Sequence, residues 1–424
     1  MKIIELFAGI GGFRIGFESA NKNLNSDYFK VVWSNQWEPN ERAQYASQVY
    51  VNKWGEKNHS NEDIETICER EMSSGSGEKI LPKYDLLVGG FPCQDYSVAK
   101  TLRSAEGIHG KKGVLWWSIY KIISITAPKY VLLENVDRLI SSPAKQRGRD
   151  FAIMLSCLND LGYVVEWRII NAAEYGFAQR RKRIFIFASK ETTKYAKKII
   201  KSPFTSIYKN GIFPQAFPVI GKEKNLEENL LPNFSISDLD LDVITTNFNK
   251  GGKKTPFLNS GISFKRNIWT ERVIPNYSGK FDCIRNHLVK DSDVPAEYYI
   301  SKKEYEEKWF PLKDAKKIER ISKSGIPYLY SEGRIACPDE LNKPARTIIT
   351  SEGGKTPSRF KHIIFKDGKY RRLTPVELEG LSGFPKNHTR LDIIPDKKRA
   401  FFIGNALVTG VVDRLGISIY KLIG

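Results

Sequence analysis

The chain has 424 residues, which is long for one domain and predicts two, each able to bury its own core. Lysine and arginine total 67 against 48 acidic residues, and the formal charge of +19 favours an anionic partner, most commonly nucleic acid. A merely soluble basic protein is the alternative.

Five scattered cysteines without a CxxC pair argue against a disulfide framework and a zinc site. The N-terminus lacks the order of a signal peptide, and no apolar run reaches the roughly 18 residues of a membrane span. We therefore expect a monomer in a prokaryotic cytoplasm, associated with the nucleoid, with no metal and no membrane partner.

Over the first 190 residues, short apolar runs typical of buried strands alternate with helical segments, clearest at residues 113–126 and 151–163. This order predicts an α/β domain with a mixed, mostly parallel, Rossmann-like sheet, whose ligands bind beyond the carboxyl ends of the strands. The expected strands are residues 3–8, 31–35, 85–90, 130–135, 165–170 and 183–188.

From about residue 191 the alternation stops, and the chain to about 369 is rich in Asn, Ser, Pro, Gly and Lys. Within 250–290, nine basic residues against two acidic ones are interleaved with aromatic residues. This mixture suits contact with phosphates and bases, although a surface insertion with a small core of its own would look similar. The basic candidates for DNA contact are Lys253, Lys254, Lys265, Arg266 and Arg272.

The last part of the chain returns to an α/β texture, so the simplest layout is one α/β domain interrupted by a smaller, irregular one. We expect a catalytic domain at 1–190 that is completed by 396–424. The second domain is expected at 191–369, with a hinge at 370–395.

The stretch LFAGIGGF (6–13) places small residues where the first strand turns into a helix, so that backbone N–H groups can face a ligand. The dinucleotide fingerprint GxGxxG would need a glycine where Arg14 stands. A smaller nucleoside cofactor is therefore favoured over a pyrophosphate, with a tight turn that binds no ligand as the alternative.

Polar and aromatic residues end the second expected strand. Gln36, Trp37 and Glu38 stand where side chains can bind ribose hydroxyls and stack on an adenine. Further on, Asp63 and Ile64 could present a carboxylate and a backbone amide to the adenine edge. An exposed polar loop is the alternative in both places.

The cysteine of GGFPCQDYS (89–97), Cys93, follows a predicted central strand. A buried cysteine is usually inert packing, and a reactive one needs a site that favours its thiolate. The position of Cys93 at the carboxyl end of a strand favours a nucleophile.

Charged residues meet the same expected sheet edge from two further strands. Glu134 and Asn135 close the run YVLLEN, where a buried carboxylate must be paired or used as an acid. In QRRKRIFIF, strand alternation would send Arg181 and Arg183 to one face and Lys182 to the other. Two inward guanidiniums could hold a carboxylate and a carbonyl oxygen, whereas a solvated basic edge is the alternative.

FAGIGG, GGFPCQ, ENV, QRRKR and the late GNAL together resemble the cytosine-C5 DNA methyltransferases of bacterial restriction-modification systems, in order and spacing. The resemblance covers nearly the whole chain outside about 191–342. It implies S-adenosylmethionine as cofactor and double-stranded DNA as partner, with a restriction endonuclease encoded nearby.

The resemblance also implies a mechanism. Cys93 would add to C6 of a flipped cytosine, Glu134 would neutralise charge at N3, Arg183 would bond O2, and Arg181 would orient Glu134. C5 would then attack the methyl group of the cofactor.

The implied DNA contacts lie in a closing stretch from Gln94 to about Gly113, with Ser97, Lys100 and Arg103. One departure concerns the second motif, where the family usually has an acidic residue and this chain has Gln36, so that either Gln36 or Glu38 binds the ribose. The implied cofactor residues are Phe7, Gly9, Ile10, Gly11, Gln36, Trp37, Glu38, Asp63, Ile64, Phe91, Leu115, Asn405 and Ala406.

The target-recognition region is expected at 191 to about 342, organised by KPARTIIT (343–350). Two other functions remain open. Methylation of tRNA by the same chemistry would suit a shorter variable region, and a dinucleotide-dependent oxidoreductase is disfavoured by Arg14 and by the Glu-Asn-Val run. The DNA sequence that is read does not follow from the residues.

Overall fold

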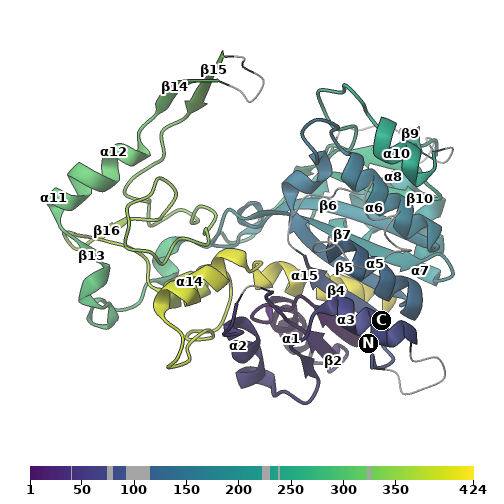
Figure 1. The fold of residues 1–424 in the computed structure, drawn as a ribbon, viewed down its shortest axis with the longest axis horizontal. Coiled ribbons are helices and arrows are strands. Elements are labelled where there is room, and N and C mark those ends of the chain that lie inside the picture. The colour runs from purple at the N-terminus through teal and green to yellow at the C-terminus, as the bar shows by residue number, and fades with distance from the viewer. Residues whose placement is uncertain are drawn as a thin grey trace. The chain divides into compact units, whose positions relative to one another are not determined.

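The computed structural model describes residues 1–39, 41–73, 80–91, 115–221, 230–236, 239–321, 325 and 327–424. These residues form two compact units (Figure 1). Unit 1 comprises Met1–Tyr175, Lys182–Gly279 and Thr409–Gly424, and unit 2 comprises Gly176–Arg181 and Lys280–Val408.

Unit 1 is built on one mixed sheet, which has ten strands within the described residues (Figure 1). The strand order is β3-β2-β1-β4-β5-β7-β6-β10-β11-β9, parallel from β3 to β5 and antiparallel at every pairing after β5. The bounds are β1 Lys2–Leu6, β2 Lys30–Asn35, β3 His59–Ser60, β4 Leu86–Gly90, β5 Tyr130–Val136, β6 Tyr163–Asn171, β7 Lys182–Lys190, β9 Phe234–Ser235, β10 Ser260–Phe264 and β11 Asn267–Glu271.

The six strands expected from the sequence are confirmed as β1, β2, β4, β5, β6 and β7. Their apolar side chains alternate between the two faces of the sheet, as the period of two requires. The side chains on one face, among them Ile4, Leu6 and Leu133, belong to a buried cluster. The same cluster contains side chains of the helices before β4, between β4 and β5, and after β5.

Helices cover the sheet, and those that carry this cluster are α3, α5 and α6. Helices α1 and α15 pack so closely that a side chain at Gly16 would collide with Val412. The helix bounds in unit 1 are α1 Gly12–Leu24, α2 Tyr45–Trp54, α3 Ile64–Ser73, α5 Leu115–Thr126, α6 Arg149–Asp160, α7 Lys194–Lys201, α8 Pro203–Thr205, α9 Ile212–Ala216, α10 Leu241–Asn247 and α15 Thr409–Ile423.

The unit boundaries differ from the layout expected from the sequence. Residues 191–279 belong to unit 1, because β10 pairs with β6 and carries β11 and β9 beyond it. Residues 370–395, expected as a hinge, and 396–408, expected to complete the first domain, both belong to unit 2. The assignment of target recognition to 191–369 concerns function and stays a prediction.

Unit 2 combines short strands and helices around buried ion pairs. Arg371 and Glu377 are both buried and form one such pair at 2.7 Å, with Glu377 also completing a capping box with Thr374. The bounds are β13 Tyr299–Ile300, α11 Lys302–Glu304, α12 Phe310–Lys313, β14 Lys316–Ile321, β15 Pro327–Glu332, β16 Ile364–Lys366, β17 Lys369–Arg371, α13 Pro375–Leu381 and α14 Asp396–Asn405.

The stretch KPARTIIT (343–350) belongs to unit 2, and its expected role in organising the target-recognition region stays a prediction. Its Ala345 bonds the backbone of Ala178 and Arg180, in the short segment Gly176–Arg181. A side chain at Gly404 of α14 would lie 2.5 Å from the backbone nitrogen of Thr350, so only glycine lets these backbones meet.

The stretch Asp396–Ile423 passes a test of length and apolar composition for a membrane span, although 61 % of its apolar window is buried inside the protein. Burial of that kind is typical of a core helix, and the helix bounds leave residues 406–408 between α14 and α15.

Candidate active site

The turn after β1 has the backbone geometry of a ligand-binding loop. Phe7, Gly9 and Gly11 have φ values of 54°, 55° and 83°, in the left-handed region where glycine is favoured and Phe7 is strained. A side chain at Gly11 would collide with the ring of Trp54. Helix α1 begins at Gly12 without a side-chain cap, so its first N–H groups can face a ligand.

The end of β2 holds this loop in place. The side-chain oxygen Oε1 of Gln36 accepts a hydrogen bond of 2.7 Å from the N–H of Gly9, and the N–H of Ala8 donates to the carbonyl of Asn35. Gln36 is buried, whereas Trp37 and Glu38 are half-buried. Since its oxygen is engaged with Gly9, the predicted contact of Gln36 with a ribose would have to use the amide N–H groups.

The other expected adenine contacts lie at the start of α3. The carboxylate of Asp63 accepts a hydrogen bond of 3.0 Å from the N–H of Glu65, which caps the helix. The side chain of Ile64 is buried in the core, which leaves its backbone as the part that could meet a ligand. The carboxylate of Asp63 therefore has a structural partner in addition to the predicted one.

A buried polar cluster that the sequence did not indicate lies beneath the loop. The hydroxyl of Tyr50 donates to Glu5 Oε2 at 3.0 Å and lies 3.2 Å from Arg14 Nη1. Burial raises the pKa of Glu5 to about 7, against the opposing effects of Tyr50 and Arg14. His59 stacks on Tyr50 and bonds Ser34 and Ser47, and burial lowers the pKa of His59 to about 4.

Glu134 lies at the carboxyl end of β5 and pairs with Arg183, with 2.9 Å between Oε1 and Nε. The register explains the pair: Val136 is opposite Arg183, so Glu134 and Arg183 are diagonal neighbours on one face. Gly90 is opposite Glu134 in β4, and a Cβ there would lie 3.1 Å from Glu134 Oε2. The second glycine of GGFPC thus makes room for the carboxylate, a role that no local sequence pattern indicates.

Asn135 connects β5 to the segment that carries the expected nucleophile. Its Nδ2 donates to the carbonyl of Phe91 at 2.8 Å, and Phe91 itself is buried. Five predicted residues of the next segment lie outside the described residues: Cys93, Gln94, Ser97, Lys100 and Arg103.

Arg181 is not on the same strand as Arg183, because β7 begins at Lys182. Its guanidinium donates to the carbonyls of Ile348 at 3.3 Å and Gly404 at 3.0 Å, within unit 2. Arg183 pairs with Glu134, whereas the expected role of Arg181 in orienting Glu134 stays a prediction.

The remaining predicted residues belong to both units. Leu115 begins α5 in unit 1, whereas Asn405 ends α14 and Ala406 follows it in unit 2. The predicted basic side chains Lys253, Lys254, Lys265 and Arg272 are exposed on unit 1.

The basic and aromatic segment 250–290 is partly core. Phe257 and Trp269 are buried in unit 1, and the guanidinium of Arg266 bonds both carboxylate oxygens of Asp160. The alternative of a surface insertion with a small core of its own does not hold for Phe257, which belongs to the main core cluster, and the strands of this segment extend the main sheet.

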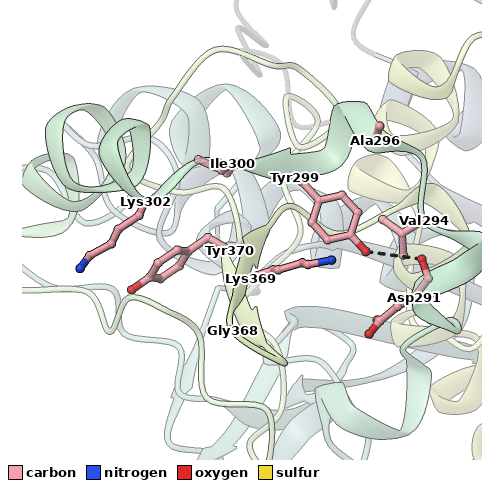
Figure 2. A pocket seen from close by; sticks show the side chains of 9 residues that line it. All are labelled: Asp291, Val294, Ala296, Tyr299, Ile300, Lys302, Gly368, Lys369 and Tyr370. Atoms are coloured by element: carbon pink, nitrogen blue, oxygen red, sulfur yellow. Dashed lines mark hydrogen bonds between the residues drawn. The ribbon is translucent and has the colours of Figure 1, made fainter.

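Figure 2 shows a pocket in unit 2 with a volume of about 620 Å³, lined by residues of β13 and β17 and of the loop before β13. Asp291 at its edge is paired with Lys366, and no predicted site residue lines it. Among the described residues, no group of three or more His, Cys, Asp or Glu could hold a metal ion.

Comparison with known proteins gives a consistent result. The model of the family described as C-5 cytosine-specific DNA methylase matches residues 1–421. The Type II methyltransferase M.Sau3AI of Staphylococcus aureus is 44 % identical over 423 residues, covering 100 % of this chain and 96 % of the relative. The Type II methyltransferase M.HhaI of Haemophilus parahaemolyticus is 29 % identical over 242 residues, which cover 57 % of this chain and 60 % of the relative.

Solved structures share the fold. The S. pombe Dnmt2 methyltransferase has a TM-score of 0.57 at 14 % identity, with 100 % of both chains covered. The Entamoeba histolytica methyltransferase EhMeth has a TM-score of 0.56 at 15 % identity, with 100 % of this chain and 99 % of that chain covered. These likenesses confirm an α/β methyltransferase fold with a mixed sheet.

The buried carboxyl of Glu5 predicts a measurable pH dependence of stability. Between about pH 4.5 and pH 7 the folded protein keeps a proton on Glu5 that the unfolded chain has lost, so the free energy of unfolding falls as the pH rises through this range. Glu5→Gln should remove this part of the slope, on the order of 2 kcal/mol between pH 5 and pH 7.5. Urea denaturation at both pH values measures it.

Glu56→Gln is the matched control, since Glu56 is exposed in the same unit. A part of the slope should survive in Glu5→Gln, because burial also raises the pKa of Glu166 to about 7. Equal slopes for Glu5→Gln and the wild type would contradict the assignment.

The contact between Gln36 and Gly9 predicts which residue of the second motif serves the cofactor. Gln36→Ala removes the acceptor that holds the loop, and the KM for S-adenosylmethionine should rise about 10-fold or more, as expected for loss of a positioned hydrogen bond. Glu38→Ala should raise it less than about 3-fold. Initial-rate kinetics at saturating DNA measure both, and a larger effect of Glu38→Ala would assign the ribose contact to Glu38.

Proposed function

Since the chain belongs to the family of C-5 cytosine-specific DNA methylases and is a DNA (cytosine-5-)-methyltransferase, we propose that it methylates C5 of a cytosine within one specific sequence of double-stranded DNA. The methyl donor is S-adenosylmethionine. The observation that carries the proposal is the pair of Glu134 and Arg183 at the carboxyl edge of the sheet. Glu134 lies opposite Gly90, and Gly90 stands three residues before Cys93 in the chain.

The residues present fit this donor. The uncapped start of α1, the left-handed glycines before it and the amide of Gln36 form a polar cradle of the kind that holds a nucleoside. Phe7, Gly9, Ile10, Gly11 and Gln36 would hold S-adenosylmethionine, which supplies the electrophilic methyl group.

The chain supplies the activation of the cytosine. Cytosine C5 is a poor nucleophile, and we propose that the thiolate of Cys93 adds to C6, which makes C5 nucleophilic. Charge then grows toward N3 and O2 of the ring, where Glu134 and Arg183 can meet it. After methyl transfer, loss of the C5 proton and elimination of Cys93 release the product.

The contact between Arg183 and Glu134 supports these roles. Arg183 binds Glu134 through Nε and the carbonyl of Lys182 through Nη1, and a guanidinium has five N–H donors. A further donor can therefore reach O2 of the base while Nε keeps Glu134 directed at N3. One arginine thus fixes the acid and takes part in binding the ring.

Double-stranded DNA requires that the target base leave the helix, because C6 is inaccessible in a stacked duplex. We infer that residues 94–113, which lie outside the described residues, close over the flipped base. Methylation would protect host DNA in a prokaryotic cytoplasm from a cognate endonuclease, with the enzyme acting as a monomer. The similarity to a Type II methyltransferase along 96 % of its length favours DNA over tRNA as the substrate.

Covalent catalysis predicts the behaviour of a cysteine variant. Cys93→Ser should abolish transfer of labelled methyl to duplex DNA while DNA binding is kept, because a hydroxyl cannot replace the thiolate. With wild-type protein, a 5-fluorocytosine at the target should trap a covalent complex, since the C5 position has no proton to lose. Denaturing electrophoresis measures the complex, and methylation without such a complex would contradict the mechanism.

The role of Glu134 predicts a loss of rate without a loss of cofactor binding. Glu134→Gln removes the acid beside N3 and should lower kcat by about 10²- to 10⁴-fold. The exposed Glu174 in the same unit provides the control Glu174→Gln, which should keep the wild-type rate. Single-turnover methylation measures both, and an unchanged rate for Glu134→Gln would remove Glu134 from the mechanism.

A further inference from the structure

The strands β14 and β15 form a hairpin that pairs with no other strand of the described chain. Figure 1 shows it projecting from the rest of unit 2. Lys316 lies opposite Glu332 at its base, and Ile321 lies opposite Pro327 near its tip. Residues 322–324 and 326, between the strands, lie outside the described residues.

The hairpin exposes large apolar side chains on both faces. Ile321 is 75 % exposed, Leu329 60 %, Tyr328 44 % and Ile318 43 %. A two-stranded sheet alone is marginally stable in water, and clustered exposed apolar side chains usually mark a binding surface. The hairpin therefore has the properties of an element that is covered when a partner binds.

The register separates two chemically different faces, because residues opposite one another in antiparallel strands share a face. One face combines basic and aromatic side chains: Lys316, Ile318, Arg320, Tyr328, Tyr330 and Glu332. The other face is more apolar toward its tip: Lys317, Glu319, Ile321, Pro327, Leu329 and Ser331.

A chain of contacts fixes Arg320 on the first face. Its guanidinium carbon lies 3.8 Å from the centre of the Tyr330 ring, whose hydroxyl donates to Glu332. Glu332 in turn pairs with Arg359 at 3.0 Å. The orientation of Arg320 is thus linked, contact by contact, to the base of the hairpin.

The base itself is held by buried cations. Arg359 is 8 % exposed and donates to the carbonyls of Leu312 and Asp314 at 2.9 and 2.6 Å, and to that of Gly333. Lys313 donates to the carbonyl of Arg359 at 2.8 Å. These bonds hold both ends of the hairpin to the rest of unit 2, so a side chain farther along the hairpin is presented in a defined position.

We propose that the β14–β15 hairpin enters the major groove of the substrate DNA, and that Arg320 reads a base edge there. The proposal rests on the function proposed above. A two-stranded ribbon fits the width of the major groove, and a guanidinium can bond O6 and N7 of guanine together. Ile321 and Leu329 supply the apolar contact that suits a thymine methyl group.

The charge of the hairpin favours DNA over other occupants. Lys316, Lys317 and Arg320 stand against Glu319 and Glu332 in the described strands, and Glu332 is already paired with Arg359. Within a chain of formal charge +19, pairing of two copies would bring like charges together. A polyanion with apolar groups in its groove matches both kinds of side chain.

The test compares two neighbouring cations on opposite faces of one strand. Arg320→Ala and Lys317→Ala remove the same charge, but only Arg320 has the oriented guanidinium. Methylation of a duplex set that varies one base pair at a time, read by conversion sequencing, gives the discrimination of each variant. The KM for S-adenosylmethionine and the unfolding temperature serve as controls for the fold.

We expect Arg320→Ala to reduce discrimination at one base pair of the target by about 10- to 100-fold. Lys317→Ala should lower kcat/KM by the same factor for every duplex, so that the sequence preference is kept. Arg320→Lys keeps the charge but not the planar fork, and should behave like Arg320→Ala. Tyr330→Leu, which removes the ring beneath Arg320, should show a smaller loss at the same base pair.

Unchanged discrimination in Arg320→Ala, with wild-type cofactor KM, would overturn the proposal and leave the proposed function intact. A wild-type protein that methylates no duplex in the set, or in genomic DNA, would overturn both. If sedimentation shows that the wild type is a dimer and that Ile321→Asp dissociates it without altering discrimination, the hairpin is an interface between copies and the proposal fails.

Discussion

The reversal of strand direction between β5 and β7 is the constraint on which the site depends. Because β7 runs antiparallel to β5, its first residues lie beside the carboxyl end of β5, where Val136 is opposite Arg183. Arg183 then shares a face with Glu134 and reaches its carboxylate. A parallel β7 would begin at the other edge of the sheet, and the buried carboxylate of Glu134 would have its partner a strand length away.

The strand β4, which precedes the expected nucleophile in the chain, ends at the same edge. Gly90 is opposite Glu134, and the absence of a side chain there leaves space for the carboxylate beside β4. Asn135 bonds the carbonyl of Phe91, which ties the end of β5 to the residue that follows β4. The strands β4, β5 and β7 thus meet at one edge through one register, which brings together segments that are far apart in sequence.

Features set by a local pattern, such as the strands, could be predicted from the sequence. Features set by pairing between distant segments, such as the order of the added strands in the sheet, could not. Apolar runs identified the six strands from β1 to β7 that carry the site, and their order placed Glu134 and the glycine loop at one edge. That β10 joins β6 depends on hydrogen bonds between segments about 90 residues apart, which no local period records. Phe257 and Trp269 therefore looked like base-stacking residues but serve the core. The alternation argument does not reach Arg181, because β7 begins only at Lys182, so the expected role of Arg181 stays a prediction.

Net charge alone is a poor guide to DNA contact, because several cations of this basic chain bond backbone carbonyls inside the protein. Arg168 donates to the carbonyl of Ile207 and to Ser260, and burial lowers the pKa of Arg168 to about 10. Arg359 and Lys313 likewise donate to backbone carbonyls at the base of the hairpin. Arg320 differs in geometry: the contact with Tyr330 uses the face of the guanidinium, whereas its N–H donors lie in the plane. An arginine bound by its face is held in place and still has its hydrogen-bonding edge for a base, which a carbonyl-bound arginine has lost.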